Sequence, residues 1–309
     1  MSEIPDVAEK YTGAIEDVPI GKGDYIAGGI KGMPFLSFEN PVKRRPMIAG
    51  EIFDCLEGYP QLAADMFDGR QNDPVEWADM WRSMGADIIC IRFAGLDPSK
   101  GNTTPESATE LVKKISDITQ LPIMICGCGI QEYDIPAFTK ICETVTDTRL
   151  ILSKVDEDEY KKMASIAIAN NHIVLGFSNL DVNLAKQMNI LLTDFGVKKN
   201  DIVMDPLMSP LGMGLDYSYS VNERIRMAAL MGDKMLQVPM VCDCTESWNV
   251  GDAICDDDPT IGDVKLRVTW WEAITALCAV ISGADIIIMR GPGAADMLKG
   301  YCDELRGEI

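Results

Sequence analysis

A regular alternation of short apolar runs and longer segments of helical periodicity is the feature that most constrains how this sequence can fold. Eight such runs follow Arg45, each four to six residues long and almost continuously apolar. Parallel strands buried on both faces have this pattern, whereas strands with one solvated face alternate apolar and polar residues. The predicted strands are 47–51, 87–92, 122–126, 150–153, 173–177, 202–205, 239–243 and 286–290.

Helical patterns occupy the intervals between these runs. The first has Asp73 as a helix N-cap and Pro74 at the first helical position, and Gly85 supplies the stop. Tryptophan and methionine recur at helical spacing between these two ends. Further helices are predicted at 107–118, 136–144, 157–170, 181–195, 218–231, 268–282 and 294–305.

One internal repeat links two of these units. Segments 85–92 and 283–290 are identical at six of eight positions, and each contains a helix stop, a buried strand and a final arginine. Their separation gives about 33 residues for each intervening βα unit, which is an ordinary length. We therefore predict a (β/α)₈ TIM barrel over residues 46–309, preceded by an extended or hairpin segment at 1–45 that could cover one barrel end. A doubly wound open sheet is the alternative.

The charge balance excludes two classes of partner. With 28 basic and 48 acidic residues the net charge is −20, so the chain repels nucleic-acid phosphates and anionic lipid headgroups. No apolar run is long enough to cross a bilayer, and the polar start MSEIPDVAEK differs from a signal peptide. We expect a cytoplasmic protein that binds neither nucleic acid nor membrane.

The ten cysteines predict packed thiols rather than disulfides, because the chain is large and shows no export signal. There is no Cys-x-x-Cys, and the nearest pairs are Cys126 with Cys128 and Cys242 with Cys244. That spacing is unusual for zinc or iron–sulfur sites, so we expect no metal site in this chain. The single histidine, His172, begins a predicted strand and should lie opposite the face where barrels place their active sites.

Polar side chains end six of the eight predicted strands. They are Glu51, Arg92, Ser153, Asp205, Asp243 and Arg290. Barrel active sites lie at this carboxyl-end face, where three long loops also follow strands, at 53–72, 206–217 and 244–266. The carboxylates could perform acid–base chemistry or bind the nitrogen edge of a pterin. The alternative is a ring of salt bridges between the acidic and arginine side chains.

An ordered set of motifs is spread along the chain. It comprises RPMIAGEIFD at 45–54, GAD at 85–87, LDP at 96–98, LDVN at 180–183, QMNI at 187–190, DP at 205–206, LGMG at 211–214, YSYS at 217–220, ERIR at 223–226, GDKM at 232–235 and WEAIT at 271–275. This set covers most of residues 28–300. It resembles the small, or delta, subunit family of the corrinoid iron–sulfur protein in acetyl-CoA decarbonylase/synthase systems.

The resemblance implies a barrel paired one-to-one with a large subunit, forming a heterodimer. The large subunit would carry the four-iron, four-sulfur cluster and hold a cobalamin-type corrinoid against the carboxyl-end face of this barrel. It would accept a methyl group from a methyltetrahydropterin-dependent methyltransferase and deliver it to acetyl-CoA synthase, both of them transient partners. The small subunit would then position and shield the cofactor without reacting itself.

Candidate corrinoid contacts follow from the predicted loop positions at that face. They are Ser178, Asn179, Asp205, Gly212, Gly214, Asp243, Thr245 and Gly291. Small polar groups and backbone amides can hold corrin amide side chains without reacting with the metal. The chain has no Asp-x-His-x-x-Gly motif, so we expect it to supply no lower axial histidine.

Two other functions remain open at this point. The barrel could itself be a methyltransferase that binds a methyl-pterin, with Asn179, Asp205 and Asp243 near the pterin ring. It could also be a structural scaffold whose mouth touches only protein. Binding of a methyl-pterin by the isolated chain would distinguish the first from the second.

Overall fold

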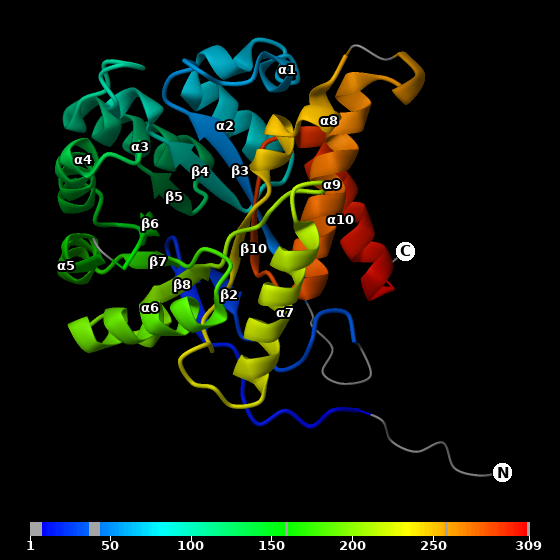
Figure 1. Cartoon of the computed structure of the whole chain (residues 1–309). Helices are drawn as coiled ribbons and strands as arrows, with labels where there is room; N and C mark the ends of the chain where they lie inside the picture. The colour runs from blue at the N-terminus through cyan, green and yellow to red at the C-terminus, as the bar shows by residue number, and fades with distance from the viewer. Residues whose placement is uncertain (1–7, 37–43, 158–159, 257–258, 308–309) are drawn as a thin grey trace.

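The computed structural model describes residues 8–36, 44–157, 160–256 and 259–307, and everything stated below concerns these residues (Figure 1). Parts of the predicted N-terminal segment 1–45 and of the loop 244–266 therefore lie outside the described residues. Helices surround a central ring of strands, as the ribbon shows.

Eight parallel strands form the ring in the order in which they occur along the chain. Seven neighbouring pairs are hydrogen-bonded ladders, and the ring closes through a bridge between Met204 and Met240. An open doubly wound sheet would reverse its strand order part-way, so the TIM barrel is confirmed. The strands are β3 (Met47–Phe53), β4 (Ile88–Arg92), β5 (Ile123–Cys126), β6 (Ile151–Val155), β7 (Ile173–Phe177), β8 (Ile202–Asp205), β9 (Val241–Asp243) and β10 (Ile286–Met289).

The helices follow the strands in alternation. As expected, the Asp73 side chain accepts a hydrogen bond from Val75 N at 2.8 Å and Pro74 opens the helix. The α-helices are α1 (Gln61–Ala64), α2 (Pro74–Ser83), α3 (Pro105–Thr119), α4 (Gln131–Thr144), α5 (Tyr160–Asn170), α6 (Val182–Phe195), α7 (Leu215–Leu230), α8 (Gly251–Ile254), α9 (Val264–Ser282) and α10 (Pro292–Arg306). Among the residues that the structure describes, no helix has the length and apolar character needed to cross a bilayer.

The start of α4 differs from its prediction by more residues than any other helix start among the described residues. The helix expected at 136–144 begins instead at Gln131, so Pro136 lies inside it. The side chain of Asp134 accepts hydrogen bonds from Cys128 N at 2.8 Å and Gly129 N at 2.9 Å. These bonds tie the first turn to the preceding loop, and they hold the helix start although Pro136 cannot donate a backbone hydrogen bond.

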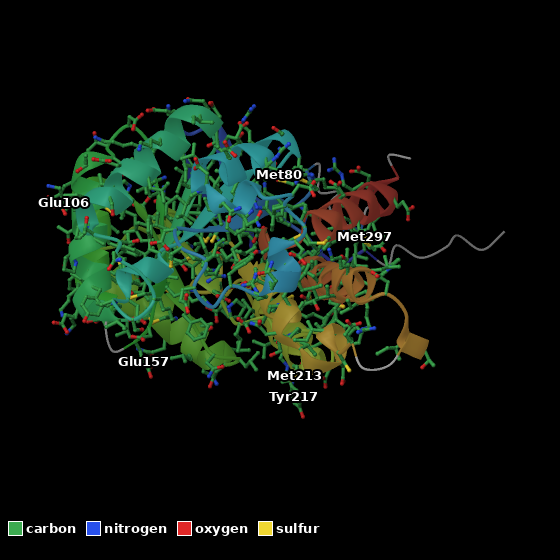
Figure 2. The ribbon with its side chains drawn as sticks, turned by 90° about the horizontal axis from the view of Figure 1, so that it is seen from above. Met80, Glu106, Glu157, Met213, Tyr217 and Met297 are labelled. Carbon is green, nitrogen blue, oxygen red and sulfur yellow. The ribbon has the colours of Figure 1, made fainter. Side chains whose placement is uncertain are left out.

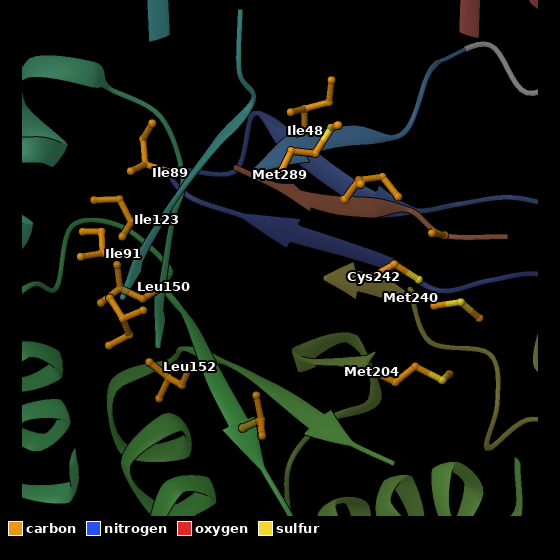
Figure 3. Close-up of a cluster of buried hydrophobic side chains, with 14 of the residues drawn as sticks. Ile48, Ile89, Ile91, Ile123, Leu150, Leu152, Met204, Met240, Cys242 and Met289 are labelled. Atoms are coloured by element: carbon orange, nitrogen blue, oxygen red, sulfur yellow. The ribbon is translucent and has the colours of Figure 1, made fainter. Parts of the chain in front are cut away.

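The larger part of the core lies between the barrel and its helices. Side chains that alternate along the strands point outward there, among them Ile48, Ile91 and Leu152 (Figure 3). Gly50 leaves room for the buried Trp81 of α2, whose indole N–H donates to Glu51 O at 3.0 Å. This contact fixes the first barrel strand against its helix.

The barrel interior is a second core, and a hairpin covers one of its ends. Strands β1 (Asp17–Ile20) and β2 (Tyr25–Gly28) are antiparallel, and Val18 and Ile20 pack on the first interior residues of the barrel strands. Arg149 anchors the hairpin by donating to Pro19 O at 2.6 Å. The amino-terminal end of the barrel is therefore closed, while the division of the chain at residue 45 stays a prediction.

Candidate functional site

Four charged side chains form a network across the carboxyl-end mouth of the barrel. Glu51 on β3 is fully buried and accepts hydrogen bonds from Arg92 of β4 and from Arg290, which follows β10. The Nε–Oε2 distance between Arg290 and Glu51 is 2.6 Å. Arg92 also reaches Asp243 at the end of β9, with 2.6 Å between Nη2 and Oδ2. We call Glu51, Arg92, Asp243 and Arg290 the mouth network.

A further ion pair lies beside this network. The ammonium group of Lys154, in β6, is 2.9 Å from Oδ2 of the buried Asp205 and lies over the ring of Phe177, 4.7 Å from its centroid. The other carboxylate oxygen of Asp205 accepts from Leu207 N at 2.9 Å. Asp205 therefore fixes both the cation and the start of the loop that follows β8.

The charges at the mouth satisfy one another. Burial raises the pKa of Asp243, but Arg92 and Lys154 outweigh it and hold that pKa below the usual value. Burial likewise lowers the pKa of Lys154, but the carboxylates of Asp205 and Asp243 together outweigh burial and hold that pKa above the usual value. The predicted salt bridges between acidic and arginine side chains are confirmed for Glu51, Arg92, Asp243 and Arg290. Asp205 pairs instead with Lys154, and Ser153 takes part in no ion pair.

A pocket of about 380 Å³ opens next to the mouth, between the carboxyl ends of β4 to β7; we call it the side pocket. The strand-end residues Arg92, Cys126 and Ser153 line its inner wall, and Lys154 and Phe177 line its rim. Cys126 and Ser153 are also register partners across β5 and β6. The sequence placed Arg92 and Ser153 at the mouth, but nothing in its pattern separated the side pocket from the rest of that face.

Four of the eight predicted contact residues converge on the mouth. Asp243 and Thr245 are joined by a 2.7 Å hydrogen bond from the Thr245 hydroxyl. Ser178 and Asp205 are fully buried, and Ser178 N donates to Asp205 O at 2.9 Å. The Ser178 hydroxyl has no hydrogen-bond partner among the described residues.

The other four lie elsewhere. Asn179 is exposed just beyond Ser178, and Gly212 and Gly214 lie on the loop between β8 and α7, both with positive φ. Gly291 is buried, and its N–H donates to Glu272 Oε2 at 2.8 Å. The Gly291 amide, which was expected to contact a ligand, is therefore already bonded to a carboxylate of α9, and no local pattern of residues predicts that contact.

The loop carrying the two glycines is held by helix α9. The indole N–H of Trp271 donates to Leu211 O at 2.7 Å, and Leu211 N donates to the Thr275 hydroxyl at 3.1 Å. Next to the glycines, Met213 and Tyr217 are 64% and 69% exposed and project together from one edge of the molecule (Figure 2). The loop and the first turn of α7 thus present two large exposed side chains, which the strand and helix patterns did not predict.

The cysteines and the histidine have no shared ligand geometry. Cys126, Cys242 and Cys244 are buried and Cys128 is partly buried; Cys126 and Cys128 also line the side pocket. Within the described ranges, no group of three or more His, Cys, Asp or Glu side chains is placed to hold a metal ion. His172 is buried at the amino end of β7, where Nδ1 accepts from Leu150 N at 3.2 Å and burial lowers its pKa to about 4.

Comparison with known proteins decides the family. The family model described as CO dehydrogenase/acetyl-CoA synthase delta subunit matches residues 17–299. This chain belongs to that family. The delta 1 subunit of the acetyl-CoA decarbonylase/synthase complex of Methanosarcina thermophila is 32% identical over 325 residues, covering 99% of this chain and 74% of that protein. The delta subunit of the same complex from Methanothermobacter thermautotrophicus is also 32% identical, over 94% of this chain and 75% of that protein.

Solved structures support the fold of this delta-family chain. Dihydropteroate synthase from Burkholderia cenocepacia superposes with a TM-score of 0.61 at 15% identity, over 96% of this chain and 98% of the other. The enzyme from Stenotrophomonas maltophilia, with imidazole in its active site, gives 0.54 at 15% identity, over 84% and 92%. At this identity the likeness concerns the barrel alone.

Proposed function

We propose that this chain is the small subunit of a corrinoid iron–sulfur protein in an acetyl-CoA decarbonylase/synthase complex. Its carboxyl-end face covers a corrinoid that a large subunit holds, in a cytoplasmic heterodimer whose large subunit carries the iron–sulfur cluster. Membership of the delta family over residues 17–299 supports the assembly. The observation that carries the covering role is the mouth network, because its two carboxylates and two guanidinium groups pair with one another and neither carboxylate is left unpaired to act as a base.

The residues at this face fit a large amide-rich ring. The exposed amide of Asn179 can pair with corrin amides, and the backbone at Gly212 and Gly214 has no Cβ to keep a ring away, whereas the Ser178 hydroxyl is buried beneath this surface. The corrinoid, when bound, supplies the cobalt that carries the methyl group. The single histidine, His172, is buried at the other barrel end, so it would not contact a corrinoid bound at this face.

Shielding is the role left to this chain's own residues. Met213 lies on the loop anchored to α9 and Tyr217 lies in the first turn of α7, and their exposed side chains can exclude water from a bound ring. Asp205 and Asp243 pair with Lys154 and Arg92, so neither carboxylate is left unpaired to react with a bound group. The face would act as a cover that separates from the large subunit when the methyl donor or acceptor approaches.

The test is co-expression with the candidate large subunit, followed by size exclusion and an absorbance spectrum under strict anaerobiosis. We expect a one-to-one complex with corrinoid bands. Tyr217→Ala should weaken it, whereas the matched control Met231→Ala should not, because Met231 is equally exposed, at 65%, but lies at the far end of α7.

Three outcomes would separate the alternatives. A lone chain that ignores the large subunit and binds a methyl-pterin would replace the proposal with a methyltransferase. A complex whose corrinoid spectrum is unchanged by Tyr217→Ala, although assembly weakens, would indicate a purely structural scaffold. Equal effects of the Tyr217 and Met231 variants would remove this edge of the barrel from the interface.

A further inference from the structure

Cys126 lines the side pocket, and a second, fully buried thiol lies behind it on the neighbouring strand. Cys126 ends β5, and its Sγ is 3.6 Å from Sγ of Cys90 on β4. The register of the two strands pairs Cys126 with Arg92, and that of β5 and β6 pairs it with Ser153. Cys126 therefore has a thiol, a guanidinium and a hydroxyl as immediate neighbours.

These neighbours stabilise a negative sulfur. The hydrogen bond with Cys90, the charge of Arg92 and the hydroxyl of Ser153 lower the pKa of Cys126, against burial, to about 7. The same interaction raises the pKa of Cys90, so the negative charge belongs on Cys126. Ser153 is 2% exposed, and its hydroxyl has no oxygen or nitrogen partner among the described residues. The hydroxyl proton can therefore point toward the sulfur of Cys126 or toward a ligand.

Donors remain for a ligand even though the cations are paired. Arg92 uses Nε and Nη2 for Glu51 and Asp243, and a guanidinium has five N–H groups. Lys154 has three N–H groups, one of which faces Asp205. Both side chains line the pocket and are partly exposed, at 21% and 32%.

The remaining walls limit what can enter. Phe138 and Phe177 supply apolar surface, suited to the carbon part of a small molecule. Two acidic residues also line the pocket, Asp134 and Asp156. Both oxygens of Asp134 are occupied by backbone N–H groups of the loop before α4, so its charge is already compensated.

We propose that the side pocket binds a small carboxylate, whose oxygens meet Arg92, Ser153 and Lys154, and that Cys126 stands beside it as a reactive thiolate. None of the eight predicted corrinoid contacts lines this pocket, although its two cations, Arg92 and Lys154, pair with two of them, Asp243 and Asp205. A carboxylate that bears an electrophilic carbon would alkylate Cys126. The thiolate sulfur attacks that carbon, the S–C bond forms, and the leaving group departs with its electron pair.

Two alkylating agents of equal size test the carboxylate and the thiolate together. The full chain is treated with iodoacetate or iodoacetamide at pH values from about 5.5 to about 9, on both sides of the pKa of about 7 of Cys126, and each cysteine is followed by peptide mass spectrometry. Cys278 on α9 is the internal control, since burial raises its pKa and it does not line the side pocket. We expect the iodoacetate-to-iodoacetamide rate ratio to be about tenfold higher at Cys126 than at Cys278, with iodide released in both reactions.

Competition in the unmodified chain gives a measurement that needs no variant. Acetate at millimolar concentration should slow alkylation of Cys126 severalfold, whereas acetamide should not, and Cys278 should respond to neither. Equal rate ratios at the two cysteines, or no protection by acetate, would overturn the proposal.

Two substitutions then assign the roles. Lys154→Met should lower the iodoacetate preference at Cys126 severalfold and leave the iodoacetamide rate unchanged. Cys90→Ala removes the thiol that donates to Cys126, so the pH midpoint of alkylation should rise. A midpoint that does not move would show that Cys90 does not stabilise the thiolate.

Discussion

Replacing Glu51 by glutamine tests whether the mouth network holds the barrel together. Glu51 is fully buried, and its carboxylate is the partner of both Arg92 and Arg290. In Glu51→Gln, Arg92 keeps Asp243, but Arg290 is only 5% exposed and no other ion pair among the described residues involves it. The amide NH₂ group would also face a guanidinium, so two donors would meet.

An uncompensated buried charge of this kind costs about 3–5 kcal/mol. Since a whole domain has a stability of about 5–15 kcal/mol, the variant should unfold at a much lower urea concentration. The matched control is Asp296→Asn, the same change of carboxylate to amide at a 64% exposed position whose ion pair with Lys299 is 3.3 Å long, and it should cost under about 1 kcal/mol.

Urea unfolding followed by circular dichroism measures both variants at pH 7. A loss below about 1 kcal/mol in Glu51→Gln would refute the reasoning, because it would mean that water or a shift of Arg290 compensates the missing charge. The double variant Glu51→Gln/Arg290→Met should regain part of the loss, with a coupling of about 1–3 kcal/mol between the two sites.

Three further predictions concern other buried contacts. Burial raises the pKa of Glu272 to about 7, above its usual 4.5, although Trp248 and two backbone N–H groups donate to its carboxylate. Because the folded state binds this proton more tightly than the unfolded state, the free energy of unfolding should fall by about 3 kcal/mol as pH rises from about 4.5 to 7. Glu272→Gln should remove this pH dependence in urea titrations. Gly50→Ala would place a Cβ 2.3 Å from the buried Trp81 ring and should cost about 1–3 kcal/mol, so an unchanged thermal midpoint would contradict the packing. Ile20→Ala empties a fully buried position in the hairpin that closes the barrel and should cost about 2–5 kcal/mol by chemical denaturation; a smaller cost would show that the hairpin is not part of the core.

The strands were predictable because burial on both faces imposes a local pattern. All eight predicted strands are present, and their ends differ from prediction by a few residues. The strand predicted at 150–153 continues to Val155, which brings Lys154 into the sheet and next to Asp205. A lysine inside a buried run breaks the apolar pattern, so only the neighbouring carboxylate explains its position.

The candidate residues were predictable only in part. Being at the carboxyl end of a parallel strand places a residue at the mouth, and this rule located Asp205, Asp243 and Thr245. The same rule placed Gly291 at the mouth but could not foresee that Glu272, on another helix, takes its N–H. The side pocket was missed because it depends on how Cys126 and Ser153 face each other across two strands.

The sequence by itself determined the alternation of strands and helices, the barrel and the family, since each is encoded in periodicity or in ordered local motifs. The tertiary structure alone decided which charges neutralise one another and which donors remain free. Arg92 meets Asp243, far along the chain, because the ring of strands closes and brings β4 and β9 to one mouth. Such contacts depend on side-chain directions and burial in three dimensions, which no local pattern of residues specifies.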